Sequence, residues 1–560
     1  MEDGLEHGRD VTTMLREPRV ARSIGVGVAV ALLAGLAHAF VLRWTCDDAF
    51  ISFRYARNLL RGQGLVFNPG EAVEGYTNFL WTLGVSLGMG LGIDPIDWSH
   101  AWGLLSWLAV GVGLAGLAWR SGRLPVAAVA WAAFPYGRVF ATSGLETMGF
   151  TALATGAVLL GVSARSRQGA LVAGVLASMA LLTRPEGALV VAAVGAVVTW
   201  RSRHLLVAVA LPVAVLVLPW LAFKLYFYGE LLPNTYYAKA GAGPRWGDGL
   251  AYLGLFFGVN GVLGLGLLGW LMPDRRDRVG QVVVVGFLAV YFVHIARAGG
   301  DFMYARFLVP LVPLLCVGLE RLVDRAMQHD GRMAVLGVAV ALGVFAAPPP
   351  DGIFQDVDPD DVGAGGVVDE RSWYPPEAIA LAREQGAALR ECVSKTSVRS
   401  VYYGTQAMLM FYADLPYALE PHVGLTDYDV ARMPPPEGVR VGHGQKADTA
   451  YLRSRNIDLA LGYRLQLPTT KVTRIAFPGD ISGRLLTYRR PVVAELRACG
   501  ARVLDFERFL DQWIVELDTL DDDKVAKAYA SFSDYYFDHN HDPEREGAFR
   551  ARLGLPPKDD

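Results

Sequence analysis

The chain has 560 residues, of which 52% are hydrophobic and 19% are charged, and its mean hydropathy is +0.30. A soluble chain of this length is normally richer in charge and poorer in long apolar runs, so the composition indicates a membrane protein. The net charge of −3 removes the electrostatic case for binding nucleic acid. The four cysteines form no CxxC pair and have no metal-ligand spacing, which argues against the common zinc sites.

The first apolar run covers residues 23–42 and follows three arginines, Arg16, Arg19 and Arg22. It is long enough to span a bilayer and lacks the small-residue pattern of a signal-peptide cleavage site. We therefore expect residues 1–22 to be a cytoplasmic N-terminal tail and the apolar run to be a retained first membrane helix.

Further apolar stretches predict membrane helices, several of them short, at 79–93, 101–119, 124–140, 147–163, 169–183, 188–200, 205–223, 251–272, 280–296, 306–323 and 333–347. Arginine clusters between them mark cytoplasmic loops, so the intervening loops, chiefly 43–78 and 224–250, face outward. The pattern gives about 11 helices if the stretch 79–119 crosses once and about 13 if it crosses three times. We favour 11, and both counts place the C-terminus outside.

The rest of the chain is less apolar. Residues 23–347 form the predicted transmembrane domain, and 348–370 form a linker that is rich in proline and acidic residues. Residues 371–560 alternate strand-like and helix-like runs, which predicts a soluble α/β domain outside the membrane. Cys392 and Cys499 both lie in this domain, and a disulfide between them is one possibility that the sequence leaves open.

Two adjacent carboxylates, Asp47 and Asp48, follow the first helix within a few residues. Burying a carboxylate is costly unless it meets a partner, so paired acids beside the bilayer indicate a functional site. One of them could take the proton of an incoming sugar hydroxyl, while the other holds structure or a metal ion. The alternative is that the two acids are a solvated cap of the following helix.

Polar residues of the other outer loops are further candidates for binding a sugar or a phosphate. They are Arg54, Tyr55, Glu74, Tyr76 and Thr77 in the first loop, and Glu146, Arg184, Glu186, Asp301 and Arg306 in three later loops. Arginine suits a phosphate because its fork matches the phosphate oxygens. Alternatively, the glutamate–arginine pairs pin helices together, and the aromatic residues are interfacial anchors.

An aromatic-rich loop at 228–239 contributes Asn234, Tyr236 and Lys239 as candidates. Aromatic rings stack on sugars or lie beside a prenyl chain, and a lysine can meet a phosphate as a point charge. The alternative is an interfacial aromatic belt with a snorkelling lysine. His443 lies in a glycine-framed loop of the outer domain, although a lone histidine is more often structural than catalytic.

Taken in order, these motifs resemble the AftB-like terminal arabinofuranosyltransferases of mycobacterial-type cell walls, which have the GT-C fold of integral-membrane glycosyltransferases. The motifs that carry the resemblance are Asp47–Ala56, Val73–Thr77, Ser143–Thr147, Arg184–Gly187, Pro233–Lys239 and Gly300–Met303. The resemblance implies a polyprenyl-phosphate sugar donor and an active site on the periplasmic face of the bacterial inner (plasma) membrane. It also implies that an acid of the first outer loop, Asp47 or Asp48, is the key catalytic group.

The sequence thus predicts a glycosyltransferase that moves a sugar, with an arabinofuranose-like pentose favoured, from a polyprenyl phosphate to a cell-envelope glycan. The chain has no P-loop, Rossmann fingerprint or zinc signature, which argues against a nucleotide-sugar enzyme and an ATP-driven transporter. We expect no cofactor, because the two acids could hold a divalent cation but no ligand spacing supports one. The alternatives are a flippase or exporter of a lipid-linked glycan and a non-catalytic membrane scaffold.

Overall fold

The structure is a computed structural model of the chain, and it describes residues 17–240, 243–273, 277–329, 367–403, 407–434, 447–462, 471–479 and 481–558. The chain divides into two compact units. The helical unit comprises Met1–Leu60, Tyr76–Pro233 and Ala242–Pro375, and the sheet unit comprises Arg61–Gly75, Asn234–Gly241 and Pro376–Asp560. Two segments from the predicted outer loops therefore group with the C-terminal part of the chain.

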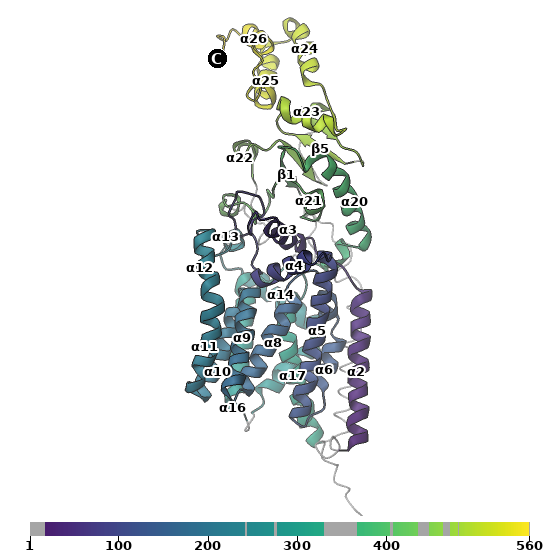
Figure 1. Ribbon diagram of the computed structural model, residues 1–560, viewed down its shortest axis with the longest axis vertical. Helices are drawn as coiled ribbons and strands as arrows, with labels where there is room; N and C mark the ends of the chain where they lie inside the picture. Colours follow the sequence, from purple (N-terminus) through teal and green to yellow (C-terminus); the bar gives the residue numbers. More distant parts are fainter. Residues whose placement is uncertain are drawn as a thin grey trace, which may run out of the picture. The chain divides into compact units, whose positions relative to one another are not determined.

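The helical unit is a bundle whose helices run alongside one another (Figure 1). Its helices are α2 (Pro18–Val41), α3 (Ala49–Leu60), α4 (Phe79–Gly90), α5 (Pro95–Arg120), α6 (Val126–Ala133), α7 (Pro135–Phe140), α8 (Thr147–Ser163), α9 (Arg167–Thr183), α10 (Gly187–Arg201), α11 (Leu206–Pro212), α12 (Leu218–Phe227), α14 (Trp246–Val259), α15 (Gly261–Leu271), α16 (Arg278–Ala298) and α17 (Val312–His329).

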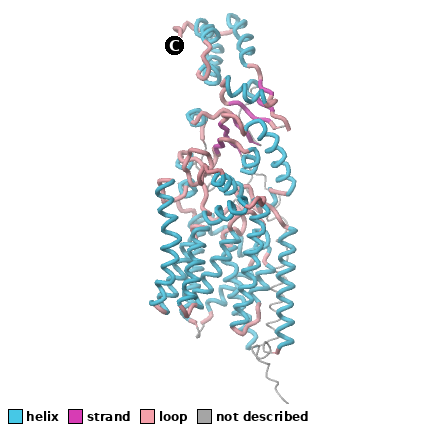
Figure 2. The backbone as a smooth tube through the Cα atoms, in the orientation of Figure 1, coloured by secondary structure: helices cyan, strands magenta, loops and turns pink. Residues whose placement is uncertain are grey.

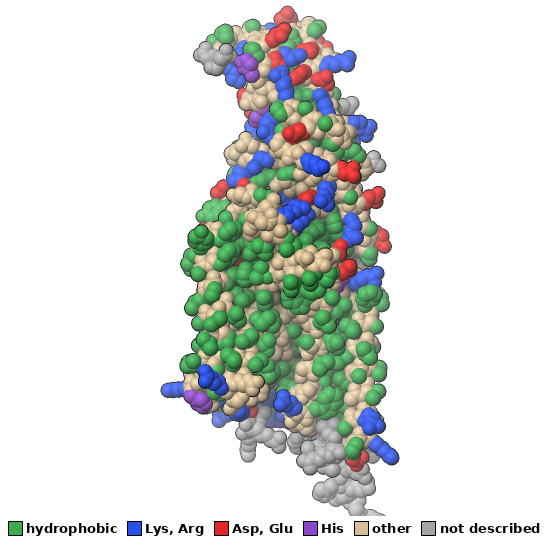
Figure 3. Space-filling view, viewed as in Figure 1, with side chains coloured by type: hydrophobic (Ala, Val, Ile, Leu, Met, Phe, Trp, Pro, Cys, Tyr) green, Lys and Arg blue, Asp and Glu red, His purple; other side chains and the backbone are tan. Residues whose placement is uncertain are grey.

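Four helical runs in the described residues are long and apolar enough to cross a membrane: Pro18–Val41, Pro95–Arg120, Arg203–Phe227 and Arg278–Ala298. A fifth crossing results if α14 and α15, which are bent by 98° at their junction, are one broken span. Large apolar side chains stay exposed on these helices, and Figure 3 shows them covering the flanks of the helical unit. A bilayer removes the cost of that exposure, so the chain is a multi-pass membrane protein.

Three predicted spans, 79–93, 124–140 and 251–272, differ from the helices observed. The span 124–140 breaks between α6 and α7 at Pro135, because proline cannot donate the backbone hydrogen bond that would continue the helix. The span 251–272 is the bent pair α14–α15. In the stretch 79–119 only α5 runs along the bundle, since the 12-residue α4 lies across the ends of the long helices in Figure 1. This favours one crossing there.

The predicted span 333–347 lies outside the described residues, so the total of about 11 membrane helices stays a prediction.

Glycines bring α15 and α17 into close contact. A Cβ atom added at Gly269 would overlap the carbonyl oxygen of Gly318, and one added at Gly266 would overlap that of Leu315. Small residues at such crossings let two helix backbones approach, and the resulting van der Waals contact replaces the hydrophobic driving force that is weak inside a bilayer.

The sheet unit contains a six-stranded sheet with the strand order β2-β1-β3-β5-β4-β6 (Figure 2). Its strands are β1 (Arg399–Tyr403), β2 (Tyr417–Leu419), β3 (Leu459–Gly462), β4 (Arg474–Ala476), β5 (Ser482–Leu485) and β6 (Arg502–Val503). β1 pairs in parallel with β2 and β3, and the remaining pairs are antiparallel. The predicted combination of a helical membrane bundle with a C-terminal α/β region is confirmed.

Eight helices complete the sheet unit in the described residues. They are α13 (Asn234–Ala240), α20 (Pro376–Val393), α21 (Ala407–Ala413), α22 (Thr449–Ser454), α23 (Arg490–Ala498), α24 (Phe506–Glu516), α25 (Asp522–Phe532) and α26 (Pro543–Arg552). Cys392 at the end of α20 and Cys499 after α23 form a disulfide, with 5.0 Å between their Cα atoms. The structure therefore pairs the two cysteines whose relation the sequence left open.

Asn68, from the loop predicted to be the first outer one, closes one edge of this sheet. Its side-chain nitrogen donates to the Ala418 carbonyl at 3.0 Å, and its side-chain oxygen accepts from the Ala418 N–H at 3.0 Å. The carboxamide thus satisfies both backbone groups of a residue on the edge strand β2, as a neighbouring strand would.

We predict that Gly269→Ala destabilises the helical unit, because the added methyl group has to push α15 away from α17. Overpacking of this kind costs about 1–3 kcal/mol, and it would appear as a lower melting temperature of the purified protein in detergent. Gly264→Ala on the same helix is the control, since its added Cβ would meet only Phe257 at 3.8 Å. Equal melting temperatures for both variants would contradict the close crossing.

Candidate functional site

Asp47 and Asp48 lie at the point where α3 begins. The N–H of Phe50 donates to the Asp47 carbonyl at 3.0 Å, so the first helical turn starts on the acids themselves. The preceding residue, Cys46, donates its N–H to the Ser143 carbonyl at 2.8 Å, which ties this loop to the loop before α8. Asp47 is only 4% exposed and Asp48 is half-buried. A solvated cap would leave both side chains in water, so the alternative interpretation fits Asp47 poorly.

A hydrogen-bonded network fixes the other side of α3. Asn78 donates to Glu146 at 2.9 Å and to Ser52 of α3 at 3.1 Å. Glu146 also accepts from Arg184 at 2.8 Å, and Arg184 in turn donates to Glu186 at 2.8 Å. The chain of contacts therefore links α3 to the N-terminal ends of α8 and α10, since these glutamates immediately precede the two helices.

Arg184 neutralises two buried acids. Burial by itself would raise the pKa of Glu186, but the charge and hydrogen bonds of Arg184 outweigh it and lower that pKa to about 2. The same two glutamates raise the pKa of Arg184 against the opposing effect of its burial. Arg184 and Glu186 are thus both charged at neutral pH, and the hydrogen bonds of Arg184 to Glu186 and Glu146 pin helix ends together. This is the structural alternative that the sequence left open.

Arg306 is a second cation close to Arg184. Its Nε donates to Asp301, and its guanidinium centre lies 5.4 Å from the centre of the Phe307 ring. The guanidinium of Arg184 lies 5.3 Å from the same ring, so both arginines flank one aromatic side chain. Charge from Asp48 reaches Arg306 and, together with Asp301, raises the pKa of Arg306 despite its burial.

Glu370 is a residue that the sequence did not single out, because it fell in the predicted linker. It begins the short helix η4 (Glu370–Trp373) and is 5% exposed. Its carboxyl lies within electrostatic range of Asp48, Asp47 and the Asp301–Arg306 pair. No local sequence pattern indicates the position of Glu370. The segment that carries it pairs at Val368 with Met303, more than 60 residues earlier in the chain.

The remaining first-loop candidates of the helical unit pack around aromatic side chains. Tyr55 is fully buried, and its ring meets that of Tyr76 edge-on with 4.8 Å between ring centres. The hydroxyl of Tyr76 lies 3.1 Å from that of Tyr228. Arg54 is buried beside Tyr55 on α3, whereas Thr77 is half-buried. These residues frame α3 and α4, and they expose little polar surface.

The other candidates belong to the sheet unit or lie outside the described residues. Asn234 donates to three carbonyls of the 424–427 loop at 2.7–3.1 Å and accepts from Arg432 at 2.8 Å, so its carboxamide is committed to holding that loop. Glu74 is buried, and Tyr236 is 50% exposed. Lys239 lies on α13, but its side chain and the whole of His443 are outside the described residues.

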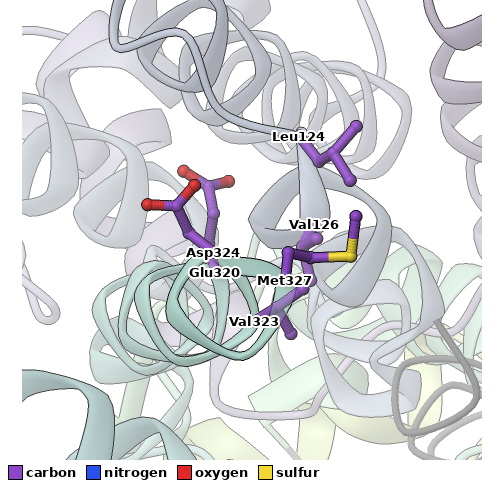
Figure 4. Close-up of a pocket in the computed structure, with 6 residues that line it drawn as sticks. All are labelled: Leu124, Val126, Glu320, Val323, Asp324 and Met327. Atoms are coloured by element: carbon purple, nitrogen blue, oxygen red, sulfur yellow. The ribbon is translucent and has the colours of Figure 1, made fainter. Parts of the chain in front are cut away.

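Glu320 and Asp324 line a small pocket between α6 and α17, together with Leu124, Val126, Val323 and Met327 (Figure 4). Glu320 accepts from the N–H of Ala127 at 3.1 Å and thereby caps the first turn of α6. α17 starts six residues after Arg306, and its stretch from Glu320 to Met327 lies roughly 12–22 Å further along the helix axis. The pocket is therefore separate from the acidic site.

The site thus combines buried acids with two arginines, which suits a reaction that needs a base and a phosphate contact. Among the residues that the structure describes, no group of three or more His, Cys, Asp or Glu side chains is arranged to hold a metal ion.

We predict that Arg184→Gln strongly destabilises the helical unit, because Glu146 and Glu186 would stay buried without a cation. Removing one member of a buried ion cluster typically costs about 3–5 kcal/mol, and the loss is measured as a fall in melting temperature in detergent. Arg245→Gln is the control, since its pair with Asp248 is partly exposed and worth about 1 kcal/mol or less. A similar loss for both variants would show that the cluster is not a structural anchor.

No protein-family model matches the chain, but two curated proteins and several solved structures are similar to it. The chain is 33% identical over 422 residues to the terminal beta-(1->2)-arabinofuranosyltransferase of Mycobacterium tuberculosis, which covers 62% of this chain and 64% of that protein. It is 28% identical over 341 residues to the protein of the same name from Corynebacterium glutamicum, with 51% and 49% covered. The matches thus span less than two thirds of either relative.

Solved structures give the fold. The crystal structure of apo ArnT from Cupriavidus metallidurans has a TM-score of 0.53 and 16% identity, and it covers 83% of this chain and 98% of ArnT. The structure of the same protein bound to undecaprenyl phosphate has a TM-score of 0.50 and 14% identity, with 72% and 86% covered. The resemblance to terminal arabinofuranosyltransferases is confirmed by the sequence matches, and the chain has the GT-C fold of integral-membrane glycosyltransferases.

Proposed function

We propose that this protein is a glycosyltransferase that moves a sugar, with an arabinofuranose-like pentose favoured, from a polyprenyl-phosphate donor to a cell-envelope glycan. The observation that carries the proposal is the buried Asp47 with the half-buried Asp48 at the start of α3, within a GT-C bundle. Two relatives named as terminal arabinofuranosyltransferases support the sugar, and a neighbour solved with undecaprenyl phosphate supports the kind of donor.

The chemistry requires one base and little acid assistance. As the acceptor oxygen attacks the anomeric carbon, its proton passes to the carboxylate of Asp47 or Asp48. The bond between the anomeric carbon and the phosphate oxygen breaks, and its electron pair stays on a phosphate that is already charged. Fixed cations can stabilise that leaving group without donating a proton.

Arg306 is the better candidate for the phosphate contact. Arg184 donates from all three of its nitrogen atoms to Glu146 and Glu186. Within the described residues, the hydrogen bond seen from Arg306 comes from Nε alone, so its terminal N–H groups remain for phosphate oxygens. Arg184 then serves mainly to hold the surrounding helix ends.

The proposed orientation places the N-terminus in the cytoplasm, and the site and the sheet unit outside the cytoplasm. Arginines such as Arg120, Arg165 and Arg201 end helices or stand in loops at the end of the bundle opposite to Asp47, as the positive-inside rule requires of a cytoplasmic face. The Cys392–Cys499 disulfide also suits an oxidising compartment.

A flippase or exporter is the second class considered. Such proteins place polar substrate groups near the middle of the membrane and are often built from inverted repeats. Here the candidate acids, together with Arg184 and Arg306, lie in loops and at helix ends, which supports transfer at the membrane surface.

We predict that Asp47→Asn or Asp48→Asn lowers sugar transfer by about 10²–10⁴-fold, because the isosteric amide cannot accept the acceptor proton. The assay uses membranes that contain each variant, radiolabelled polyprenyl-phosphate arabinofuranose and an envelope glycan acceptor. Asp97→Asn, an exposed acid in the first turn of α5, is the control and should transfer as the wild type does. Equal transfer by all four proteins would remove the catalytic assignment.

A further inference from the structure

The segment that carries Glu370 is fixed by backbone pairing. Val368 donates its N–H to the Phe302 carbonyl at 2.8 Å, and Tyr304 donates to the Val368 carbonyl at 3.0 Å. These two bonds make a parallel bridge between Met303 and Val368. Glu370 follows two residues later, so its position is set by the same loop that carries Asp301 and Arg306.

The environment of Glu370 is unusual for an acid. The side chain is 5% exposed, and its Oε2 atom is buried with no hydrogen-bond donor among the described residues. A buried carboxylate oxygen without a donor is costly, whereas a protonated carboxyl needs less stabilisation. The unsatisfied oxygen therefore points either to a proton on Glu370 or to a ligand that contacts it.

The charges around Glu370 are mostly negative. Asp48 and Asp47, from the loop before α3, act on it electrostatically, and so do Arg306 and Asp301 from the loop before α17. The thiol of Cys46 also lies within electrostatic range, and Asp369 and Arg371 are its own neighbours along the chain. Arg306, the arginine that acts on Glu370 most strongly among the described residues, is already paired with Asp301.

These surroundings favour the neutral form. Burial has the largest effect and the negative charge of Asp48 adds to it, so the pKa of Glu370 rises to about 8 although Arg306 opposes the rise. At pH 7 the carboxyl thus keeps its proton, and it loses that proton as the pH rises through about 8.

We propose that Glu370 is a positioning residue of the transferase site, a carboxyl beside Asp48 whose proton limits the negative charge that the site presents to the donor phosphate. This inference rests on the proposed function. While Glu370 is neutral, an anionic donor phosphate can approach Arg306. When Glu370 ionises, a further carboxylate faces the phosphate and repels it. Glu370 keeps its proton throughout the reaction, and the acceptor proton goes to the first-loop base as described above.

The first test does not depend on activity. Infrared spectra of the purified full-length protein are recorded from about pH 6 to about pH 10, and the band of a protonated carboxyl should vanish with a midpoint near pH 8. The contribution of Glu370 is the part of the band that Glu370→Gln lacks, and its midpoint is read from the difference between the two titrations, because the buried Glu320 on α17 also contributes a carboxyl. In Asp48→Asn the midpoint of Glu370 should move to lower pH, because a negative charge that raises the pKa has been removed, whereas Asp97→Asn should leave it in place. An unshifted midpoint in Asp48→Asn would overturn the proposal.

The second test measures sugar transfer against pH. Wild-type activity should fall about tenfold from pH 7 to pH 9, as expected for one ionisation with a pKa near 8, while Glu370→Gln keeps its activity over that range. An identical alkaline loss in both proteins would overturn the inference. Absence of transfer by the wild type at every pH would instead count against the proposed function, and the infrared titration would still decide whether Glu370 and Asp48 are coupled.

Discussion

The helical unit depends on one buried cation, Arg184, held between Glu146 and Glu186. The two acids immediately precede α8 and α10, so a single side chain joins the N-terminal ends of two apolar helices. The contacts continue through Asn78 to α3, the helix that starts at the proposed base. Apolar helix surfaces gain little free energy by packing together within a bilayer. A polar cluster whose hydrogen bonds are satisfied therefore contributes strongly to the alignment of the helix ends.

The same cluster sets the electrostatics of the site. Arg184 is paired with Glu146 and Glu186. Arg306 is a cation that interacts electrostatically with Asp48 of the first loop. The site contains more acids than arginines, so each further negative charge would repel the proposed anionic donor. An excess of carboxyl groups is tolerable only when some of them stay neutral, and burial is the means by which a fold achieves that.

Much of this could be predicted from the sequence, because membrane helices and paired acids leave local signals. Asp47, Asp48, Arg184 and Arg306 were identified from their loops, and the structure places all four in the helical unit. Glu370 was missed because its position depends on a long-range backbone bridge that has no periodicity. The hydrogen bonds that commit the Asn234 carboxamide are equally invisible, since they join residues 190 or more positions apart.

The role of Asn68 has a consequence for how such proteins can diverge. Its carboxamide completes the edge of the outer sheet, yet it belongs to the same loop that begins with Asp47 and Asp48. The salt bridge from Arg61 to Asp414, at 2.8 Å, ties the same loop to the sheet unit again. The C-terminal region is therefore not a detachable module: a chimaera that exchanged it between relatives would need to bring the matching first loop along, and evolution has to alter the two stretches in concert.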